Sequence, residues 1–209
     1  MILAVETSSP VCGVSLFTNS GEKDCEILIH PRVHAEKLAV ICKNLLQRND
    51  LSVSDLEAVA VSGGPGSFTG LRIGMSFAKG LVYANNIPLV SVNTLFAFRS
   101  AMIQKEKPGE KAVFIIPSHR DFIYTLNHAG NDIQYLKKTD FHKHYPGCEI
   151  IFSNQDLSGF EEMERRIEPI LPAYIGRFYY LDSSISPTVD YDTVKIYYGL
   201  RYEPVQWKP

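Results

Sequence analysis

The sequence lacks the features that direct a chain into a membrane or out of the cell. No apolar run reaches the roughly 20 residues needed to cross a bilayer. The first residues, Met1-Ile-Leu-Ala-Val-Glu6, contain no basic residue and reach an acid at position 6, unlike a signal peptide. The four cysteines form no CxxC pair and no cluster with histidine that would indicate zinc. These absences predict a cytoplasmic protein without membrane contact.

The chain also lacks an excess of charge of either sign. Its formal net charge is −2 over 209 residues, which argues against a large basic surface. Any contact with nucleic acid would therefore be local or supplied by a partner. Hydrophobic residues make up 45% of the sequence, enough for a core in one large domain or two small ones.

Recognisable catalytic motifs are scarce as well. The histidines form no HExxH motif, and the neighbours of His142 and His144 indicate an exposed loop rather than a metal site. The stretch Ser118-His119-Arg120-Asp121 contains the residue types of a catalytic triad, but they lie too close in sequence to form one directly. The sequence therefore predicts no catalytic residue and no metal ligand.

The apolar pattern predicts a mixed α/β chain. A three-stranded meander is expected first, with Asn19-Ser20-Gly21 as a hairpin turn. Helical spacing of apolar residues then alternates with short strands. The expected strands are 2–5, 11–17, 25–30, 58–62, 89–93, 112–117, 122–129, 133–136 and 149–153. The expected helices are 34–49, 71–85, 94–105 (capped by Thr94), 157–167 and 173–181, with a further helix start at 52–57.

This order of elements predicts two ribonuclease-H-like halves, the architecture shared by actin, sugar kinases and Hsp70. A meander followed by alternating helices and strands forms the first half, and a shorter restart of strands predicts a reduced second copy. The charged stretch Lys105-Glu-Lys-Pro-Gly-Glu-Lys111 separates the two. The predicted subdomains are therefore residues 1–106 and 107–209.

A glycine-rich turn at residues 63–70, Gly-Gly-Pro-Gly-Ser-Phe-Thr-Gly, joins a buried strand to a helix. Its spacing fits neither the dinucleotide fingerprint, nor a P-loop, nor a nucleophile elbow. Two interpretations remain: the glycines only let the chain reverse tightly, or the turn and the helix start hold an anion. Glu6 likewise either helps to bind a nucleotide or caps a turn. The residues assigned to such an anion site are Thr7, Ser8, Gly64, Gly66 and Ser67.

The helix after this turn is apolar on nearly two faces. A surface helix normally carries one apolar stripe, which covers the sheet below it. The second stripe is either buried inside the same domain or meets another helix, from residues 34–49 or from another chain. The interface interpretation is the sharper one, because monomers rarely expose a large apolar patch.

Several segments together resemble one family closely. They are Ile2-Leu-Ala-Val-Glu-Thr-Ser-Ser9, His34-Ala-Glu-Lys-Leu38, Gly64-Pro-Gly-Ser-Phe-Thr-Gly-Leu-Arg-Ile-Gly74 and Ile87-Pro-Leu-Val-Ser-Val-Asn-Thr-Leu95. Over about residues 1–100 the chain resembles the TsaB (YeaZ) family. The second half departs from the pattern, because Pro117-Ser-His-Arg-Asp121 stands where members have an Asp-Ala-Arg-like turn.

The resemblance implies a non-catalytic subunit required to make N6-threonylcarbamoyladenosine at position 37 of tRNAs that read ANN codons. A TsaD-type partner would carry the ATP, the metal and the transferase chemistry, so this chain needs no cofactor of its own. A TsaE-type ATPase would bind that heterodimer, tRNA contact would be indirect, and the chain alone would form a homodimer.

The implied interface is a bundle of the two helices 34–49 and 71–85. The residues assigned to it are His34, Leu38, Ile41, Leu45, Leu71, Gly74, Met75, Ala78, Lys79 and Val82. Met75→Glu is accordingly expected to weaken assembly without unfolding the chain. Two alternatives remain open: an ATP-binding or hydrolase-like enzyme of the same fold, and a self-associating protein with another regulatory role.

Overall fold

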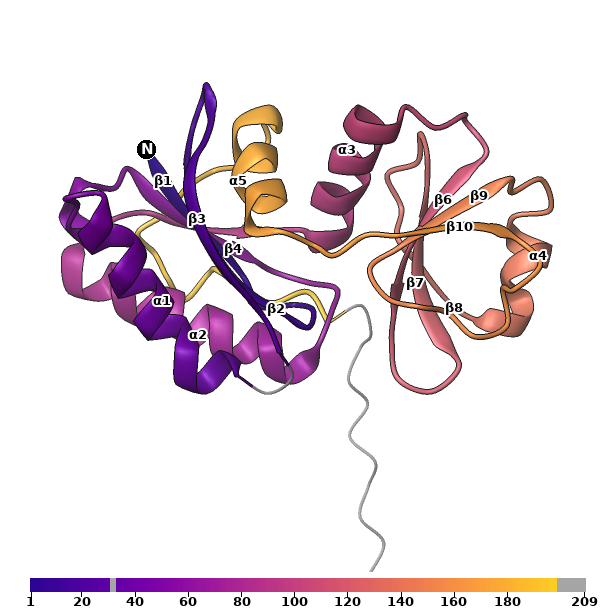
Figure 1. Ribbon diagram of the computed structural model, residues 1–209, viewed down its shortest axis with the longest axis horizontal. Coiled ribbons are helices and arrows are strands. Elements are labelled where there is room, and N and C mark those ends of the chain that lie inside the picture. Colours follow the sequence, from indigo (N-terminus) through magenta and orange to yellow (C-terminus); the bar gives the residue numbers. More distant parts are fainter. Residues whose placement is uncertain (31–32, 199–209) are drawn as a thin grey trace, which may run out of the picture.

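The computed structural model describes residues 1–30 and 33–198, which form two five-stranded sheets side by side (Figure 1). The first sheet has the strand order β3-β2-β1-β4-β5. Its central strands are parallel, and the opening meander pairs antiparallel as predicted. The strands are β1 (Ile2–Glu6), β2 (Val11–Thr18), β3 (Gly21–Ile29), β4 (Ala58–Ser62) and β5 (Leu89–Val92).

The second sheet repeats this topology. Its order, β10-β9-β6-β7-β8, contains the same sequence of antiparallel and parallel pairs as the first. The prediction of two α/β halves of this architecture, the second reduced, is therefore confirmed. The strands are β6 (Ala112–Pro117), β7 (Phe122–Asn127), β8 (Gln134–Lys137), β9 (Ile150–Ser153) and β10 (Glu164–Ile167).

The helices cover the two sheets unequally. In the first half, α1 (His34–Arg48) and α2 (Phe68–Asn85) lie together on one face of the sheet (Figure 1). In the second half the matching connections hold only the 3₁₀ turn η2 (Lys138–Asp140) and the four-residue α4 (Phe141–His144). The buried side chains of Leu157 and Phe160 fill part of the space that a helix would cover.

The predicted helix at 157–167 is wrong. Its last residues form the edge strand β10, which pairs in parallel with β9. Gly159 has a φ of +90°, a conformation that ends a right-handed helix. The apolar spacing that suggested a helix instead reflects Leu157 and Phe160 reaching the same core from irregular backbone.

Three helix starts also differ from the prediction. Residues 52–57 contain only the 3₁₀ turn η1 (Val53–Asp55), closed by a capping box between Ser52 and Asp55. Helix α2 begins at Phe68, three residues earlier than expected, because the Ser67 hydroxyl accepts a hydrogen bond from the amide of Gly70. Helix α3 (Thr94–Glu106) is capped by Asn93 rather than Thr94.

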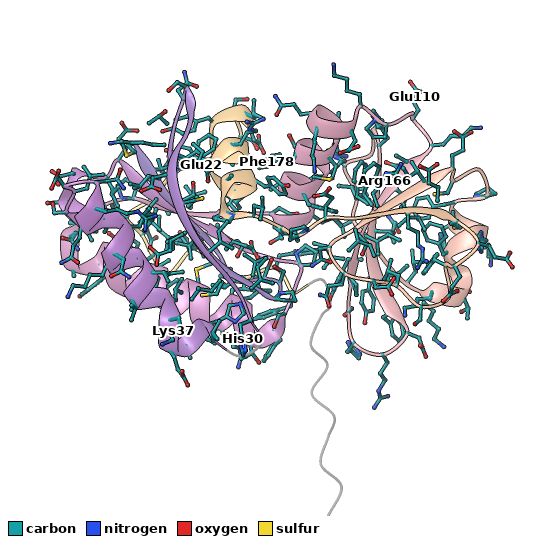
Figure 2. All side chains as sticks on the ribbon, viewed as in Figure 1. Glu22, His30, Lys37, Glu110, Arg166 and Phe178 are labelled. Atoms are coloured by element: carbon teal, nitrogen blue, oxygen red, sulfur yellow. The ribbon has the colours of Figure 1, made fainter. Side chains whose placement is uncertain are left out.

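The halves exchange helices across their junction. Helix α3 packs on the second sheet, with Phe98 against Phe114. Helix α5 (Pro172–Leu181) packs on the first sheet, where Ile175 joins the core beside Phe17. The predicted division of the chain after residue 106 stays a prediction. Helix α5 belongs to the predicted second subdomain by sequence, but it packs against the first sheet. Charged side chains such as Glu22, Lys37, Glu110 and Arg166 lie on the outside (Figure 2).

The segment after α5, residues 182–198, runs back along the first half and is called the C-terminal strap here. The backbone of Thr188 pairs with Leu89 at the edge of the first sheet, and the buried side chain of Val194 joins the core under α1 and α2. The Tyr191 hydroxyl donates to the backbone oxygen of Ile87 at 2.9 Å. Within the described part of the chain, no helix has the length and apolarity needed to span a membrane.

Candidate functional site

The glycine-rich turn packs against the turn that follows β1. The amide of Ser67 donates to the backbone oxygen of Ser8 at 2.7 Å. A Cβ atom on Gly66 would meet the same oxygen, and one on Gly70 would overlap the backbone oxygen of Thr7. These glycines therefore allow two stretches of backbone to touch, which is a packing role.

The amide donors of this turn are already used inside the protein. Gly63 N donates to the backbone oxygen of Val92 at 2.7 Å, and Gly64 N donates to the Thr94 hydroxyl at 3.0 Å. In the other direction, Tyr197 N of the strap donates to Gly63 O at 2.7 Å. Together with the pairing of Ser67 N, these bonds leave the predicted anion site without the amides of Gly63, Gly64 and Ser67.

Glu6 belongs to a buried polar cluster beside the turn, in which its Oε2 atom and the Thr7 hydroxyl have no hydrogen-bond partner among the described residues. Its carboxylate accepts hydrogen bonds from the amide of Ser8 at 2.7 Å and from the Ser8 hydroxyl at 2.6 Å. The Ser62 hydroxyl, at the end of β4, accepts from the amide of Thr7 at 3.2 Å. Burial raises the pKa of Glu6 from 4.5 to about 7, although its hydrogen bonds act in the opposite direction. Of the two predicted roles for Glu6, the hydrogen bonds to Ser8 are those of turn capping.

The ten residues predicted to meet a partner do not lie on one exposed face. Nine are buried within the chain, and Lys79 is partly exposed. Met75, for example, is 5% exposed and belongs to the core between the helices and the first sheet. The nine are His34, Leu38, Ile41 and Leu45 of α1, and Leu71, Gly74, Met75, Ala78 and Val82 of α2. The predicted face is therefore wrong, because nine of its ten residues are buried inside the chain.

The outer side of the same two helices is the surface that remains open. On α1, Val40 is 49% exposed, and on α2, Tyr83 is 79% exposed. Ile73 and Phe77 of α2 are half-buried at the edge of the core. Their i, i+4 spacing places them on one side of the helix. The sequence signal for this second apolar stripe was present, but nothing in it said which stripe meets the sheet.

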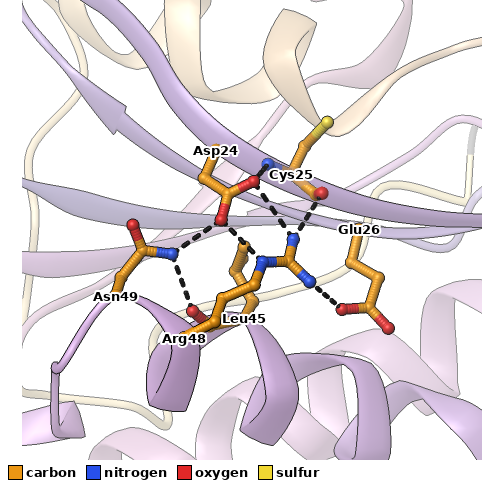
Figure 3. Close-up of polar contacts among 6 residues, drawn as sticks. All are labelled: Asp24, Cys25, Glu26, Leu45, Arg48 and Asn49. Carbon is orange, nitrogen blue, oxygen red and sulfur yellow. Dashed lines mark hydrogen bonds and ion pairs between the residues drawn. The ribbon is translucent and has the colours of Figure 1, made fainter.

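An ion-pair network fixes the position of α1 over the meander (Figure 3). Arg48, the last residue of α1, donates from Nε to Asp24 at 2.7 Å and also binds Glu26. Asn49 donates to the same Asp24 carboxylate at 2.7 Å. Arg48 and Asn49 hold the pKa of Asp24 down, at about 2. The network joins the end of α1 to β3 and so holds the outer face of α1 in place.

His30 and His34 have the spacing of an HxxxH metal-binding pair, a motif that the expectation of no metal site overlooks. The His34 ring is buried, and its Nε2 lies 3.1 Å from the backbone oxygen of Ser9 and 3.0 Å from that of Val11. Over residues 1–30 and 33–198, no group of three or more His, Cys, Asp or Glu side chains is arranged to hold a metal ion.

Comparison with known proteins now decides the family. The family model described as "TsaD: tRNA N6-adenosine threonylcarbamoyltransferase" matches residues 29–143, more than half of the chain. The tRNA threonylcarbamoyladenosine biosynthesis protein TsaB of Escherichia coli K12 is 34% identical over 104 residues, covering 50% of this chain and 45% of that protein. The chain belongs to the TsaB (YeaZ) family.

The chain is also similar to a second TsaB protein and to a threonylcarbamoyltransferase. Haemophilus influenzae TsaB is 27% identical over 150 residues, covering 72% of this chain and 61% of that protein. The tRNA N6-adenosine threonylcarbamoyltransferase of Anoxybacillus flavithermus is 30% identical over 103 residues, covering 48% and 30%. The match to the two TsaB proteins thus spans between 45% and 61% of their length.

Solved structures support the fold of this TsaB-family chain over nearly its whole length. YeaZ from Pseudomonas aeruginosa superposes with a TM-score of 0.72 at 20% identity, covering 94% of this chain and 98% of that one. A second chain with the same values is described as an uncharacterised protein with similarity to the peptidase YeaZ. At this identity the likeness shows the two-half fold and nothing about activity.

Proposed function

We propose that this chain is a non-catalytic subunit in the biosynthesis of threonylcarbamoyladenosine at position 37 of tRNAs that read ANN codons, working in the cytoplasm. The names of its TsaB relatives support the pathway. A TsaD-type transferase is its partner and carries the ATP and the metal, and a TsaE-type ATPase binds that pair. Without the partner, the chain forms a homodimer through the surface that would bind the TsaD-type protein.

The observation that carries the proposal is the outer surface of α1 and α2. It exposes Val40 of α1 and Tyr83 of α2, on a helix pair whose inner side is already filled by the sheet. The Tyr83 ring contacts Tyr191 of the strap but stays mostly exposed, and a partner helix would bury it.

The test is assembly with a TsaD-type protein, measured by pull-down and by the mass of the complex. Val40→Glu and Tyr83→Glu place a charge on the outer surface and should weaken assembly, with unchanged unfolding. Leu181→Glu is the matched control, because Leu181 is 60% exposed on α5, which lies on the opposite face of the sheet. Met75→Glu, in the core, should unfold the chain instead.

Two results would end the proposal. One is a wild-type chain that remains monomeric and does not bind a TsaD-type protein. The other is a failure to restore threonylcarbamoyladenosine in cells depleted of their own TsaB. Tight binding of ATP and Mg²⁺ by the isolated chain, measured by calorimetry, would favour the enzyme hypothesis.

A further inference from the structure

Six aromatic side chains form two groups of contacting rings, one in each half, and a hydrogen bond of the strap connects the groups. Phe68 and His119 are exposed at the two ends, and Tyr124 is buried. Phe68, at the start of α2, contacts Tyr198 with ring centroids 5.1 Å apart. The backbone oxygen of Tyr198 accepts a hydrogen bond from the Tyr124 hydroxyl at 2.8 Å, so the strap connects the first group to β7. The two groups together are called the aromatic belt here, and its members are Phe68, Tyr198, Tyr124, Tyr135, Phe122 and His119.

On the second sheet the belt is a stack of rings. Phe122 lies face to face with Tyr135, with centroids 4.9 Å apart and planes inclined by 5°. The exposed ring of His119 stacks on Phe122 at 5.7 Å and 25°. The stack therefore ends in a flat aromatic ring at the surface, which a further planar group can continue.

Positively charged side chains lie beside rings of the belt in both halves. The guanidinium of Arg72 lies 3.9 Å from the centroid of Phe68, and the ammonium of Lys137 lies 6.0 Å from that of Phe122. Arg120 is exposed on the turn beside His119. In the part of the chain that the structure describes, none of these three cations forms an ion pair, and Asp121 is the acid on the same turn.

We infer that the aromatic belt binds single-stranded RNA. Single-stranded nucleic acid is recognised by aromatic rings that stack on unpaired bases, together with cations that follow the phosphates. The belt supplies both on a protein whose overall charge is slightly negative, so the attraction is local. The inference rests on the proposed function, because an unpaired loop of tRNA is the RNA that such a subunit would meet. It departs from the indirect tRNA contact that the family resemblance implies.

The experiment measures binding of the full chain to a labelled, unstructured RNA of about 12 nucleotides, a length within the range of known single-strand sites. His119→Ala removes the terminal ring and should weaken binding about ten-fold, the size of one lost base stack. His119→Phe keeps a ring and should preserve the affinity. Arg72→Gln should reduce the dependence of log K on log salt by about one phosphate contact.

Matched controls are available off the belt. His142 is an exposed histidine on α4, and Arg166 is an exposed arginine on β10, at the other edge of the second sheet. His142→Ala and Arg166→Gln should bind the RNA as the wild type does. A blunt RNA duplex of the same length should bind more weakly than the single strand, because its bases are not free to stack.

Three results would overturn the inference. The first is no RNA binding up to about 100 μM protein at physiological salt, the weak end of non-specific affinity. The second is equal affinity for the duplex and the single strand. The third is that belt variants and control variants change the RNA affinity equally. If His119→Ala weakens assembly with the TsaD-type partner but not RNA binding, the belt is a protein contact. If the wild-type chain assembles with the TsaD-type partner but does not bind RNA, the inference fails and the proposed function remains. If the chain binds RNA through the belt but does not assemble, the proposed function fails and the RNA site remains.

Discussion

At the scale of single residues, two glycines of α2 have opposite roles. A Cβ atom on Gly70 would overlap the backbone oxygen of Thr7, which cannot turn away as a side chain can. Gly80 lies on the exposed side of the same helix, and apart from the adjoining helix backbone no atom of the described residues lies within 4 Å of the position that its Cβ would take. One glycine is thus required by a close approach, and the other only weakens the helix.

This contrast gives a paired prediction. Gly70→Ala should lower the free energy of unfolding by about 1–3 kcal/mol, as overpacking does in a tight core. Gly80→Ala should raise it by about 0.5–1 kcal/mol, the usual gain in helix propensity. Urea unfolding of both variants is the measurement. A stabilised Gly70→Ala would show that the approach to Thr7 is not tight.

A second residue-scale prediction concerns Glu6 and pH. Because burial raises its pKa from 4.5 to about 7, the folded state holds this proton over that pH interval while the unfolded state has released it. Stability should therefore fall as the pH rises from 4.5 to about 7, by roughly 3 kcal/mol from this group alone. Glu6→Gln keeps an acceptor for Ser8 and should remove this slope.

Comparing unfolding midpoints at pH 5 and pH 7.5 in wild type and Glu6→Gln tests this point. Asp24 supplies a contrast of opposite sign, since Arg48 and Asn49 lower its pKa. Its contribution is present above pH 3.8 and is lost as the pH falls toward about 2. An identical pH 5 to pH 7.5 slope in both proteins would exclude Glu6 as its source.

The sequence identified the residues of this cluster but not their arrangement. Glu6 was recognised as an acid directly after a strand, and the glycine spacing marked a special turn. What no local pattern supplied was the contact between them, because Ser8 and Ser67 are brought together by the pairing of β1 with β4. The same contact occupies the amide that an anion would have needed.

At the scale of elements, α2 shows that apolar periodicity predicts a helix but not which of its faces contacts the sheet. The sequence predicted a helix that is apolar on nearly two faces, and α2 ends at Asn85 as expected. A helical wheel cannot decide which of two apolar stripes contacts the sheet. Met75, Ala78 and Val82 face the sheet, and the outward stripe contains Ile73 and Phe77 at its border. That choice is a matter of tertiary packing, which a helical wheel does not contain.

The joint between the glycine turn and α3 gives an element-scale prediction. The buried Thr94 hydroxyl accepts from the amide of Gly64, while the amide of Thr94 donates to Gly64 O at 2.8 Å. Thr94→Val keeps the shape but leaves the Gly64 amide buried and unpaired, which should cost about 1–3 kcal/mol. Thr94→Ser keeps the hydroxyl and should cost less.

Thermal or urea unfolding of the two Thr94 variants measures the difference. If Thr94→Val is as stable as Thr94→Ser, the hydrogen bond to Gly64 contributes nothing to the joint. Asn93 is a useful reference, because its side chain accepts from the amides of Leu95 and Phe96 at the start of the same helix. Asn93→Ala should cost about 1 kcal/mol, the usual loss for an N-cap.

At the scale of the whole molecule, the duplication was visible in the order of elements, but the exchange of helices was not. Both sheets follow one topology, so a count of strands and helices was enough to propose two copies. The crossing of α3 onto the second sheet and of α5 onto the first depends on the side chains of Phe98 and Ile175. Apolar residues of this kind fit either sheet as far as a sequence pattern can tell.

The C-terminal strap is the whole-molecule feature that the sequence left unplaced. It covers the edge of β5 through the paired backbones of Leu89 and Thr188, and it anchors itself by burying Val194. It also bonds to Gly63 at the glycine turn and to Tyr124 in the second sheet. The strap therefore connects the first sheet, the turn and the second sheet, and its release should loosen all three.

Val194→Asp places a charge in the core position that anchors the strap and should detach it, because an unpaired buried charge is strongly unfavourable. The amide of Leu89, which donates to Thr188 O at 2.8 Å, should then exchange its hydrogen faster. The amides that link β6 to β9 should stay protected, because the strap makes no part of that pairing. Lys195→Asp is the matched control: Lys195 is exposed, and only its backbone oxygen is held, by Ser91 at 3.0 Å. If both aspartates change the exchange of Leu89 equally, Val194 is not the anchor, whereas an effect confined to position 194 shows that one buried side chain fastens the strap to the molecule.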